Sequence, residues 1–448
     1  MHKKLMFILV IMAFFILTVP FSSCKAQETE VNGIIYIKAD GSVVPLNANI
    51  TTQDNKTYTF IDDVHGSIIV ERDNIVIDGF GHMLQGYGSG SGINLTNRDN
   101  VTIRNMLIKN FDEGIRLCNS SNNNITEINI TLCSWYAIFA IWSSNNDISK
   151  NVISNNGAGI WLKGESNNNT IRENVIKNNT CVVGNGIGLS GVSSNYIYKN
   201  TIVNNNYGIW IKLSSSNNVI SENNIISNYI YNIWFRESSN NKVYHNNFIS
   251  ETCQAFLESS INIWDNGYPS GGNYWSNYTG MDVKWGMEQN EQGSDGIGDT
   301  VQHVDENNVD RYPLMAPITI FEAGVWDGTA YDVAIISNSI IADFHFNPFD
   351  ASIELNLTDQ NGTNFCRLII PKSLLWAGED EWTILADDVM LDYMTISDEK
   401  TTYLYFTYDY ANHIIIQGRG AISEFRQMFL LLLLVIIVII EMALATKI

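Results

Sequence analysis

Apolar and polar residues repeat with a period of about 23 residues between roughly 75 and 260, and one copy reads Asn-Asn-Thr-Ile-Arg-Glu-Asn-Val-Ile at 168–176. A constant period of this size is typical of a solenoid, in which each repeat buries its apolar face by stacking on its neighbours. The first branched aliphatic residue of the successive copies is Ile77, Ile103, Ile125, Ile148, Ile171, Ile197, Ile220 and Val243.

Within a repeat the apolar positions alternate, as in 159–163 (Gly-Ile-Trp-Leu-Lys) and 208–212 (Gly-Ile-Trp-Ile-Lys). Alternation of branched residues between Asn, Ser and Gly predicts short strands rather than helices. Each repeat holds two or three such runs, with no helical stretch between them. The pattern therefore predicts a parallel β-helix with aliphatic columns inside and columns of outward side chains along its faces.

Two further columns fit this register. Asparagines stand three residues after the anchor isoleucine, where stacked side chains can hydrogen-bond one coil to the next and the bend needs a left-handed backbone. Charged residues stand two positions after the anchor isoleucine. They are expected to pair along the column, because neighbouring strands are about 4.8 Å apart. The two columns are Asn151, Asn174, Asn200, Asn223 and Asn246, and Glu127, Lys150, Glu173, Lys199, Glu222 and His245.

Both ends of the chain indicate export. Residues 1–26 combine a basic start with an apolar run and predict a cleaved signal peptide, with a lipid-modified Cys24 as a weaker alternative. Residues 425–446 are long and apolar enough to predict a membrane-spanning helix, against the alternative of a helix buried in protein. The expected location is the extracellular side of the membrane, with a single C-terminal anchor. Asn-X-Ser/Thr sequons such as that at Asn94 are usable only outside the cytoplasm.

The net charge of −21 is unevenly distributed, because residues 281–427 contain 25 Asp and Glu against 7 Lys and Arg. Such a surface makes nucleic acid an unsuitable partner. The six cysteines are scattered without a Cys-X-X-Cys pair. Most are expected to be buried thiols, and a Cys118–Cys133 bridge across neighbouring coils is the one pairing that the spacing suggests.

The repeats end at 271–280 (Gly-Gly-Asn-Tyr-Trp-Ser-Asn-Tyr-Thr-Gly), and the acidic stretch that follows contains Asp-Gly-Ile-Gly-Asp at 295–299 and Asp-Arg-Tyr-Pro-Leu at 310–314. With the Asn-X-Ile coils, these motifs resemble the NosD-like family of right-handed β-helix proteins, also described as carbohydrate-binding and sugar-hydrolysis repeats. The opening at 35–42 resembles archaeal surface members of that family. The resemblance covers roughly 33–316 and implies the fold more strongly than an activity.

After Pro317 several alternating segments, among them 352–357 and 401–406, predict a β-sandwich. The expected chain is therefore all-β, a right-handed parallel β-helix followed by a smaller β-sandwich and a C-terminal transmembrane helix. Its segments are a signal peptide (1–26), an N-terminal β cap (27–74), the β-helix (75–275), an acidic closing loop (276–316), the β-sandwich (317–422) and the anchor (425–446).

An outward aromatic column is the sharpest candidate site. If the isoleucines before them point inward, the aromatic side chains form a strip edged by cations two residues further on. Such a strip suits a polysaccharide, whose sugar faces stack on rings while hydroxyls or carboxylates meet the cations. The alternative is that residues 317–422 or the loop 266–290 cover it. The residues are Trp161, Trp210, Trp234, Phe139 and Phe256, with Lys163, Lys212 and Arg236, and Gly188 interrupts the row.

The acidic loop is a candidate calcium site, because Asp295, Asp299, Asp305 and Asp310 offer hard oxygen ligands between glycines; a solvated connector is the alternative. Copper is implied only by the family name, and the dispersed histidines disfavour it. Glycoside hydrolysis needs two carboxylates facing one cleft, and residues 101–250 offer Asp112–Glu113 as their one adjacent pair.

The sequence thus predicts an exported, membrane-anchored surface protein that is non-catalytic: it binds a polysaccharide or another cell-envelope component, or presents a rigid adhesive surface. A polysaccharide-degrading enzyme, either a lyase or a glycoside hydrolase, and a structural envelope protein are the alternatives.

Overall fold

The computed structural model describes residues 33–181, 184–251, 254–358 and 362–422. Residues 1–34 and 35–448 separate into two units, and nearly all of the described chain belongs to the second. Every regular element of the described chain is a β-strand. No helix long and apolar enough to cross a membrane occurs among the described residues. The expected signal peptide and membrane anchor both lie outside them.

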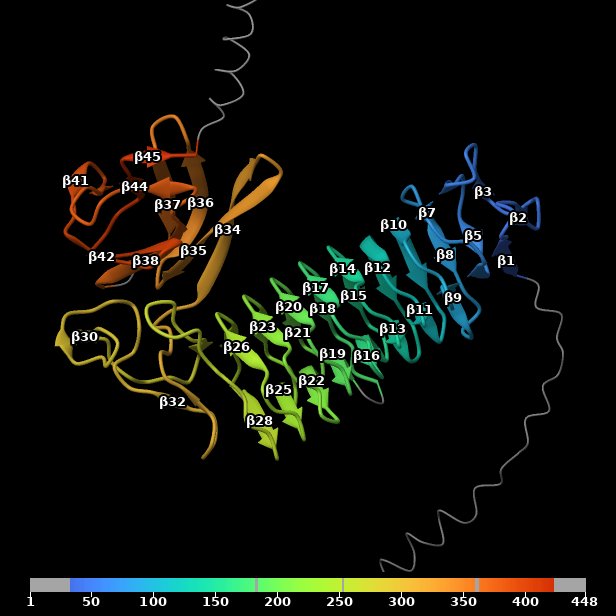
Figure 1. Ribbon diagram of the computed structural model, residues 1–448, viewed down its shortest axis with the longest axis horizontal. Coiled ribbons are helices and arrows are strands. Elements are labelled where there is room, and N and C mark those ends of the chain that lie inside the picture. Colours follow the sequence, from blue (N-terminus) through green and yellow to red (C-terminus); the bar gives the residue numbers. More distant parts are fainter. Residues whose placement is uncertain (1–32, 182–183, 252–253, 359–361, 423–448) are drawn as a thin grey trace, which may run out of the picture. The chain divides into compact units, whose positions relative to one another are not determined.

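Each coil of the solenoid contributes a strand to an 11-stranded sheet, the first sheet, whose strands from β6 onward pair in parallel (Figure 1). Its strands, in spatial order, are β2 (Val43–Val44), β1 (Ile34–Ile37), β6 (Ser67–Val70), β9 (Ser91–Asn94), β11 (Glu113–Cys118), β13 (Tyr136–Ile141), β16 (Ala158–Lys163), β19 (Asn185–Ser190), β22 (Tyr207–Lys212), β25 (Tyr231–Arg236) and β28 (Ala255–Glu258).

The remaining strands of each coil form two further parallel ladders. Strands β10 (Val101–Lys109) and β12 (Asn124–Thr131) run through both. The second ladder also contains β4 (Thr57–Phe60), β7 (Ile75–Asp78), β14 (Asp147–Ser149), β17 (Thr170–Arg172), β20 (Tyr196–Tyr198), β23 (Val219–Ser221) and β26 (Lys242–Tyr244). The third contains β5 (Val64–His65), β8 (Met83–Gln85), β15 (Val152–Ser154), β18 (Val175–Lys177), β21 (Thr201–Val203), β24 (Asn224–Ile226), β27 (Asn247–Ile249) and β29 (Tyr274–Trp275).

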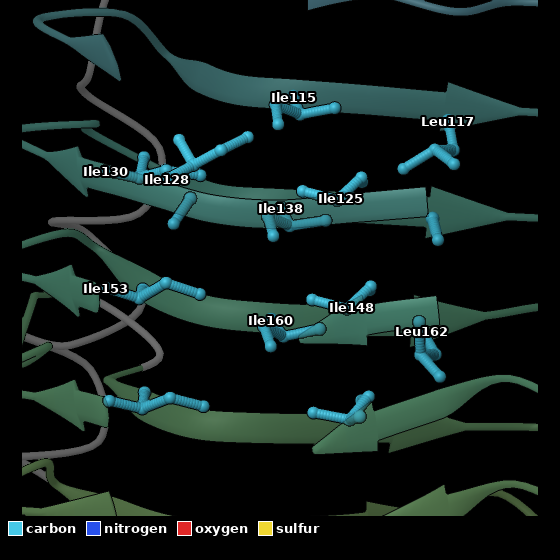
Figure 2. Close-up of a cluster of buried hydrophobic side chains, with 14 of the residues drawn as sticks. Ile115, Leu117, Ile125, Ile128, Ile130, Ile138, Ile148, Ile153, Ile160 and Leu162 are labelled. Carbon is cyan, nitrogen blue, oxygen red and sulfur yellow. The ribbon is translucent and has the colours of Figure 1, made fainter. Parts of the chain in front are cut away.

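The predicted register of the coils is confirmed. All eight anchor positions are fully buried, and each is the direct strand partner of the next, as in the pairs Ile125–Ile148 and Ile148–Ile171. Figure 2 shows the aliphatic side chains from successive coils stacked inside the solenoid. Burying one such side chain stabilises the fold by about 1.5–3 kcal/mol.

Asparagine ladders tie the coils together at the bends, as the sequence predicts. The side-chain amide of Asn174 donates to Asn200 Oδ1 at 2.9 Å, and the backbone N–H of Asn174 donates to the same oxygen at 3.0 Å. The pattern repeats from Asn151 to Asn273. Two more ladders occupy the other bends, from Asn123 to Asn262 and from Asn156 to Asn232. Buried polar side chains are thereby satisfied.

The left-handed backbone at the bends belongs to the residue before the ladder asparagine. In the anchor-proximal bend this residue is the charged one, as in Lys150 (φ 58°) and Glu173 (φ 57°). The expectation that the ladder asparagines adopt this conformation is therefore wrong. Elsewhere an asparagine precedes the ladder residue, for example Asn145 (φ 57°) before Asn146, because its short polar side chain tolerates this conformation.

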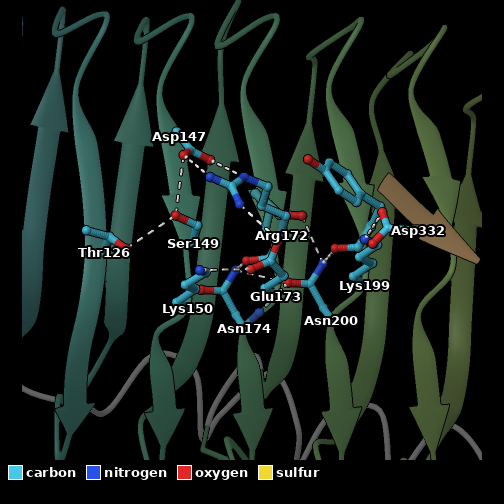
Figure 3. A network of polar contacts seen from close by, with 12 residues as sticks. Thr126, Asp147, Ser149, Lys150, Arg172, Glu173, Asn174, Lys199, Asn200 and Asp332 are labelled. Atoms are coloured by element: carbon cyan, nitrogen blue, oxygen red, sulfur yellow. Dashed lines mark hydrogen bonds and ion pairs between the residues drawn. The ribbon is translucent and has the colours of Figure 1, made fainter. Parts of the chain in front are cut away.

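The predicted pairing along the charged column is confirmed for one pair, Lys150 with Glu173, and does not extend along the whole column. Lys150 Nζ lies 3.7 Å from Glu173 Oε2, and Arg172 bonds both Glu173 and Asp147 (Figure 3). Lys199 instead pairs with Asp332 at 2.5 Å. These contacts support a packing role for the column.

The solenoid begins earlier than the sequence indicates. Strand β4 already pairs in parallel with β7, with Tyr58 opposite Ile77, so the first coil starts inside the expected cap. Two antiparallel pairs precede or flank it, β1 with β2 and β3 (Ile50–Thr51) with β4. Antiparallel pairing closes the end of a parallel stack, which would otherwise expose unpaired strand edges.

Aromatic side chains close the other end. Trp264 and Trp275 are buried, and Trp275 stacks on Phe248 with ring centroids 4.4 Å apart. The Gly-Asn-Tyr-Trp element places Asn273 in the asparagine ladder and Trp275 in the aliphatic column, opposite Phe248. This element therefore supplies the last residue of both columns, and its aromatic side chain covers the end of the solenoid.

The described residues of 318–421 form two five-stranded sheets with antiparallel pairing, in the region where the sequence predicts a β-sandwich. Buried side chains of both sheets belong to one hydrophobic cluster. The strands are β34 (Ile318–Trp326), β35 (Thr329–Ser337), β38 (Asn364–Pro371), β43 (Thr401–Tyr408) and β42 (Tyr393–Ser397), then β36 (Ile340–Asn347), β37 (Ser352–Thr358), β44 (His413–Gln417), β40 (Thr383–Ala386) and β41 (Val389–Met390). Short pairs are β30 (Lys284–Trp285) with β31 (Glu291–Gln292), β32 (Gln302–His303) with β33 (Val309–Asp310), and β39 (Leu375–Trp376) with β45 (Gly420–Ala421).

The suggested Cys118–Cys133 bridge is wrong, because both thiols are free. Cys118 ends β11, whereas Cys133 precedes β13, so the two residues stand at opposite ends of paired strands. Cys24 lies outside the described residues.

We expect Asn200→Ala to lower the free energy of unfolding by about 3 kcal/mol, since two donors of Asn174 lose their acceptor inside the solenoid. Urea unfolding of the purified chain, followed by circular dichroism, measures this. Asn277→Ala, at an exposed position, is the control and should change stability little. Equal stability of the Asn200→Ala and Asn277→Ala chains would contradict the stabilising role of the asparagine ladder.

Candidate functional site: an aromatic groove on the first sheet

A groove of about 730 Å³ lies on the outer face of the first sheet, over strands β11 to β25. Of the residues predicted for the site, Phe139, Trp161, Trp210 and Trp234 line it, together with the cations Lys163, Lys212 and Arg236. Phe256 does not line the groove. It is 40% exposed and continues the row, with its ring centroid 6.3 Å from that of Trp234.

A glycine–isoleucine step creates the outward aromatic rows. Ile209 is fully buried, and a side chain at Gly208 would come within 2.3 Å of the Asn232 carbonyl oxygen, so both residues face the interior. Two successive inward residues leave Tyr207 and Trp210 on the same outer face, although they are three positions apart. Strict alternation would have placed them on opposite faces.

The aromatic rings form a stack rather than the flat strip that the sequence suggests. Trp210 and Trp234 are nearly parallel, with an interplanar angle of 6° and centroids 4.8 Å apart. Each ring therefore covers part of its neighbour's face. Offset stacking of this kind adds about 0.5–1.5 kcal/mol beyond burial.

Trp161 closes the gap left by Gly188. A side chain at Gly188 would meet the Trp161 ring at 2.3 Å, so the indole occupies that space. Its plane is turned 80° from that of Trp210, and it is only 5% exposed. Trp161 thus belongs mainly to the packed floor, whereas Trp210 and Trp234 are partly exposed.

Sequence reasoning missed a second aromatic column. Tyr136, Tyr207 and Tyr231 stand three residues before Phe139, Trp210 and Trp234, and each packs on its row neighbour, at 5.2 Å for Tyr136 and Phe139. The recurrence of tyrosine three residues before the row could have revealed it. Trp135, 62% exposed, also lines the groove.

Cations follow one edge of the groove on neighbouring coils. Lys163 is paired in register with Ser190, Ser190 with Lys212, and Lys212 with Arg236. Lys212 Nζ lies 3.8 Å from the Trp210 ring centroid and 4.9 Å from that of Trp161. These are cation–π distances. Burial lowers the pKa of Lys212, and the charges of Arg236 and Lys163 act in the same direction.

The groove contains one carboxylate, and it is already engaged. Glu113 is buried, and its two oxygens accept hydrogen bonds from Arg116 Nη1 at 2.9 and 3.0 Å. Asp112, its neighbour in the sequence, accepts hydrogen bonds from Gly90 N–H and the Ser134 hydroxyl and does not line the groove.

In the acidic loop, Asp310 terminates an asparagine ladder. Its Oδ2 accepts hydrogen bonds from the Asn273 backbone N–H at 2.7 Å and from Trp275 Nε1–H at 2.9 Å, and its Oδ1 accepts from the Tyr312 N–H. Burial raises the pKa of Asp310 to about 7, while these donors favour the ionised form. A carboxylate fits here because it has only acceptors to offer.

The other predicted calcium ligands have separate partners. Asp295 is buried and accepts a hydrogen bond from the Ile297 N–H, Asp299 accepts from the backbone at Lys284, and Asp305 accepts from Asn308. No three of the four carboxylates come within ligand distance of one another. The structure therefore does not assemble the calcium site, which stays a prediction.

The sequence comparison identifies the family. The profile described as "Periplasmic copper-binding protein (NosD)" matches residues 22–184 and 68–280, which together span more than half of the chain. The chain belongs to the NosD family. No curated protein sequence is significantly similar to it.

Solved β-helix structures resemble this NosD-family chain at low identity. The periplasmic alginate epimerase AlgG matches with a TM-score of 0.34 and 15% identity, covering 55% of this chain and 72% of its own. The alginate lyase from Paenibacillus sp. str. FPU-7 gives 0.29 and 15%, covering 49% and 88%. A tailspike protein of E. coli bacteriophage HK620 gives 0.32 and 7%, covering 81% and 72%. These likenesses concern the fold alone.

The family description implies copper, and the candidate metal ligands among the described residues do not match the soft set that Cu(I) prefers. Their one group of three His, Cys, Asp or Glu side chains close enough to hold a metal ion is Asp62, Asp63 and His82. It offers one imidazole and two carboxylates, without the thiolate or thioether that Cu(I) prefers. His245 is buried, and its Nε2 lies 2.8 Å from the Ser270 carbonyl oxygen.

We expect Asp310→Asn to lower the free energy of unfolding by about 2–4 kcal/mol, because an amide cannot accept all four donors that Asp310 receives. Thermal unfolding of the two chains measures the difference. Glu306→Gln makes the corresponding carboxylate-to-amide change at an exposed position of the same loop and should have little effect. If the two variants lose stability equally, Asp310 does not terminate the ladder as described.

Burial raises the pKa of Asp282 from 3.8 to about 7, helped by the charges of Asp295 and Asp299. The folded chain then binds this proton more tightly than the unfolded chain does, so the contribution of Asp282 to stability falls as the pH rises between these values. We expect Asp282→Asn to gain stability relative to the wild-type chain between pH 5 and pH 8. Unfolding both chains at each pH isolates this effect from His245, whose lowered pKa acts in the opposite sense. A pH-independent difference would contradict the assignment.

Proposed function

We propose that the chain is an exported, membrane-anchored surface protein whose solenoid binds a polysaccharide in the aromatic groove without cleaving it. The observation that carries the proposal is the groove itself, in which stacked aromatic side chains and a row of cations share one outer face. The export and anchoring parts rest on the sequences of 1–26 and 425–446.

The chemistry of the groove suits sugars. A pyranose ring has apolar C–H faces and polar hydroxyls, so it is bound by aromatic carbon together with hydrogen-bond donors. Trp135, Trp210 and Trp234 offer such carbon, and Lys163 and Lys212 offer donors beside it. A contiguous apolar patch rimmed by polar groups is typical of a binding surface.

The competing explanation was that another part of the chain covers the aromatic row. Every described residue that lines the groove lies between 113 and 236. No described residue of the loop 266–290 or of 317–422 contributes to its lining. This supports a ligand surface over intramolecular packing.

Binding is favoured over cleavage by the carboxylates. A glycoside hydrolase uses one carboxyl group as acid and a second as base or nucleophile. Glu113 is the one carboxylate lining the groove, and Arg116 holds both of its oxygens. A polysaccharide lyase or hydrolase remains the alternative, which an assay for chain cleavage distinguishes.

We further propose that the two sheets of 318–421 form a β-sandwich between the solenoid and the membrane anchor. A structural envelope component, in which the solenoid only spaces or stiffens, is the remaining alternative. It would bind no polysaccharide at the groove.

We expect Trp234→Ala to weaken polysaccharide binding at least tenfold, as truncation of a central aromatic contact commonly does. The measurement is calorimetry with polysaccharides chosen by array screening of the purified chain. Tyr196→Ala removes a 51% exposed aromatic ring from β20, outside the first sheet, and should leave binding unchanged. Trp161→Ala is unsuitable, because truncating so buried a side chain costs about 3–5 kcal/mol of stability.

Unchanged affinity in the Trp234→Ala chain would contradict the groove as the binding site. Release of shorter chains from a bound polysaccharide would favour the enzyme alternative. A chain that binds no polysaccharide on the array would favour a structural envelope role.

A further inference from the structure

The cation row differs in its electrostatics from the other charged column of the solenoid. In the anchor-proximal bend Lys150 has Glu173 as a partner, and Lys199 has Asp332. Lys163 and Lys212 have no ion pair among the described residues. Arg236 contacts Glu258 at 3.3 Å, with both side chains nearly half exposed.

These like charges are held close together. Strands in a parallel ladder are about 4.8 Å apart, so Lys212 stands one coil from Arg236 and two coils, or about 10 Å, from Lys163. Cation–π contacts with Trp210 and Trp161 hold the Lys212 ammonium group over the rings. Unpaired cations gathered at a partly desolvated edge repel one another, and an incoming anion would relieve that repulsion.

The positive charge of the row contrasts with the negative net charge of the whole chain. The protein carries a net charge of −21, yet the groove is lined by four basic side chains and one carboxylate, Glu113, which Arg116 neutralises. Composition therefore does not account for this positive strip.

We infer that the ligand of the groove is an anionic polysaccharide, bearing carboxylate or sulphate groups that Lys163, Lys212 and Arg236 bind. This inference rests on the proposed function. Charge-assisted hydrogen bonds to carboxylate or sulphate are about twice as strong as neutral ones. Cations at one position of the coil, with Ser190 on the coil between Lys163 and Lys212, suit a ligand whose anionic groups repeat along its length, with the polymer running across the coils.

Single-stranded nucleic acid is the other polymer that combines rings with repeated anions. It is disfavoured by the mutual stacking of Trp210 and Trp234, which occupies the ring faces that bases would use. A glycan needs less of the ring face, because its hydroxyl and anionic groups bond to the edge of the groove.

The test compares binding of the full chain to polygalacturonate, dextran sulphate, neutral dextran and oligo-dT. The first two probes distinguish carboxylate from sulphate recognition. The double variant Lys163→Met, Lys212→Met removes both charges and leaves unbranched apolar side chains of nearly the same length. Lys177→Met, at an exposed position that ends β18, is the control with the same chemical change on another ladder.

We expect the wild-type chain to bind at least one anionic polysaccharide at least tenfold more tightly than neutral dextran, with affinity falling as salt rises. The double variant should lose that preference, roughly tenfold or more, and the salt dependence with it. The Lys177→Met chain should behave like wild type. Circular dichroism of each variant establishes that it is folded.

Three outcomes would overturn the inference. Equal binding of neutral and anionic glycans, still sensitive to Trp234→Ala, would leave the proposed function standing and remove the anionic class. Binding of oligo-dT as tightly as of the anionic glycans would show that the row recognises phosphate polymers instead. Binding of no glycan at all would remove both the inference and the proposed function.

Discussion

In-register stacking of the coils is the constraint on which the rest of the solenoid depends. Buried asparagines hold it, because each accepts two hydrogen bonds from the preceding coil and donates to the next, as Asn200 does between Asn174 and Asn223. With the backbone fixed in this way, any outward position becomes a column. The aromatic stack and the cation row of the groove exist because the same type of residue recurs at the equivalent position of different coils.

The same constraint explains the end of the solenoid. A ladder of amides has donors left over at its last coil, and these must be satisfied inside protein. Asp310 accepts them for one ladder, and Asn308 accepts the Asn262 N–H for another. The acidic stretch that follows the repeats therefore has a structural task in this chain.

Much of the fold was predictable, because isoleucine and asparagine recur at fixed spacing and the physics of a stacked coil leaves few alternatives. The anchor column from Ile77 to Val243 was predicted residue by residue. The site was only partly predictable. Tyr207 was missed because the Gly208–Ile209 step breaks the alternation, and the burial of Trp161 depends on the space above Gly188, which is a property of neighbouring coils.

The most direct test of the central claim is chemical protection of the lysines. The full chain would be acetylated with and without a saturating anionic polysaccharide, and the reactivity of each lysine measured by mass spectrometry. The account predicts that Lys163 and Lys212 lose reactivity when the polysaccharide is bound, while Lys177 and Lys199 do not. Protection of Lys177 with Lys163 and Lys212 unchanged would place the ligand elsewhere and contradict the groove as the binding site.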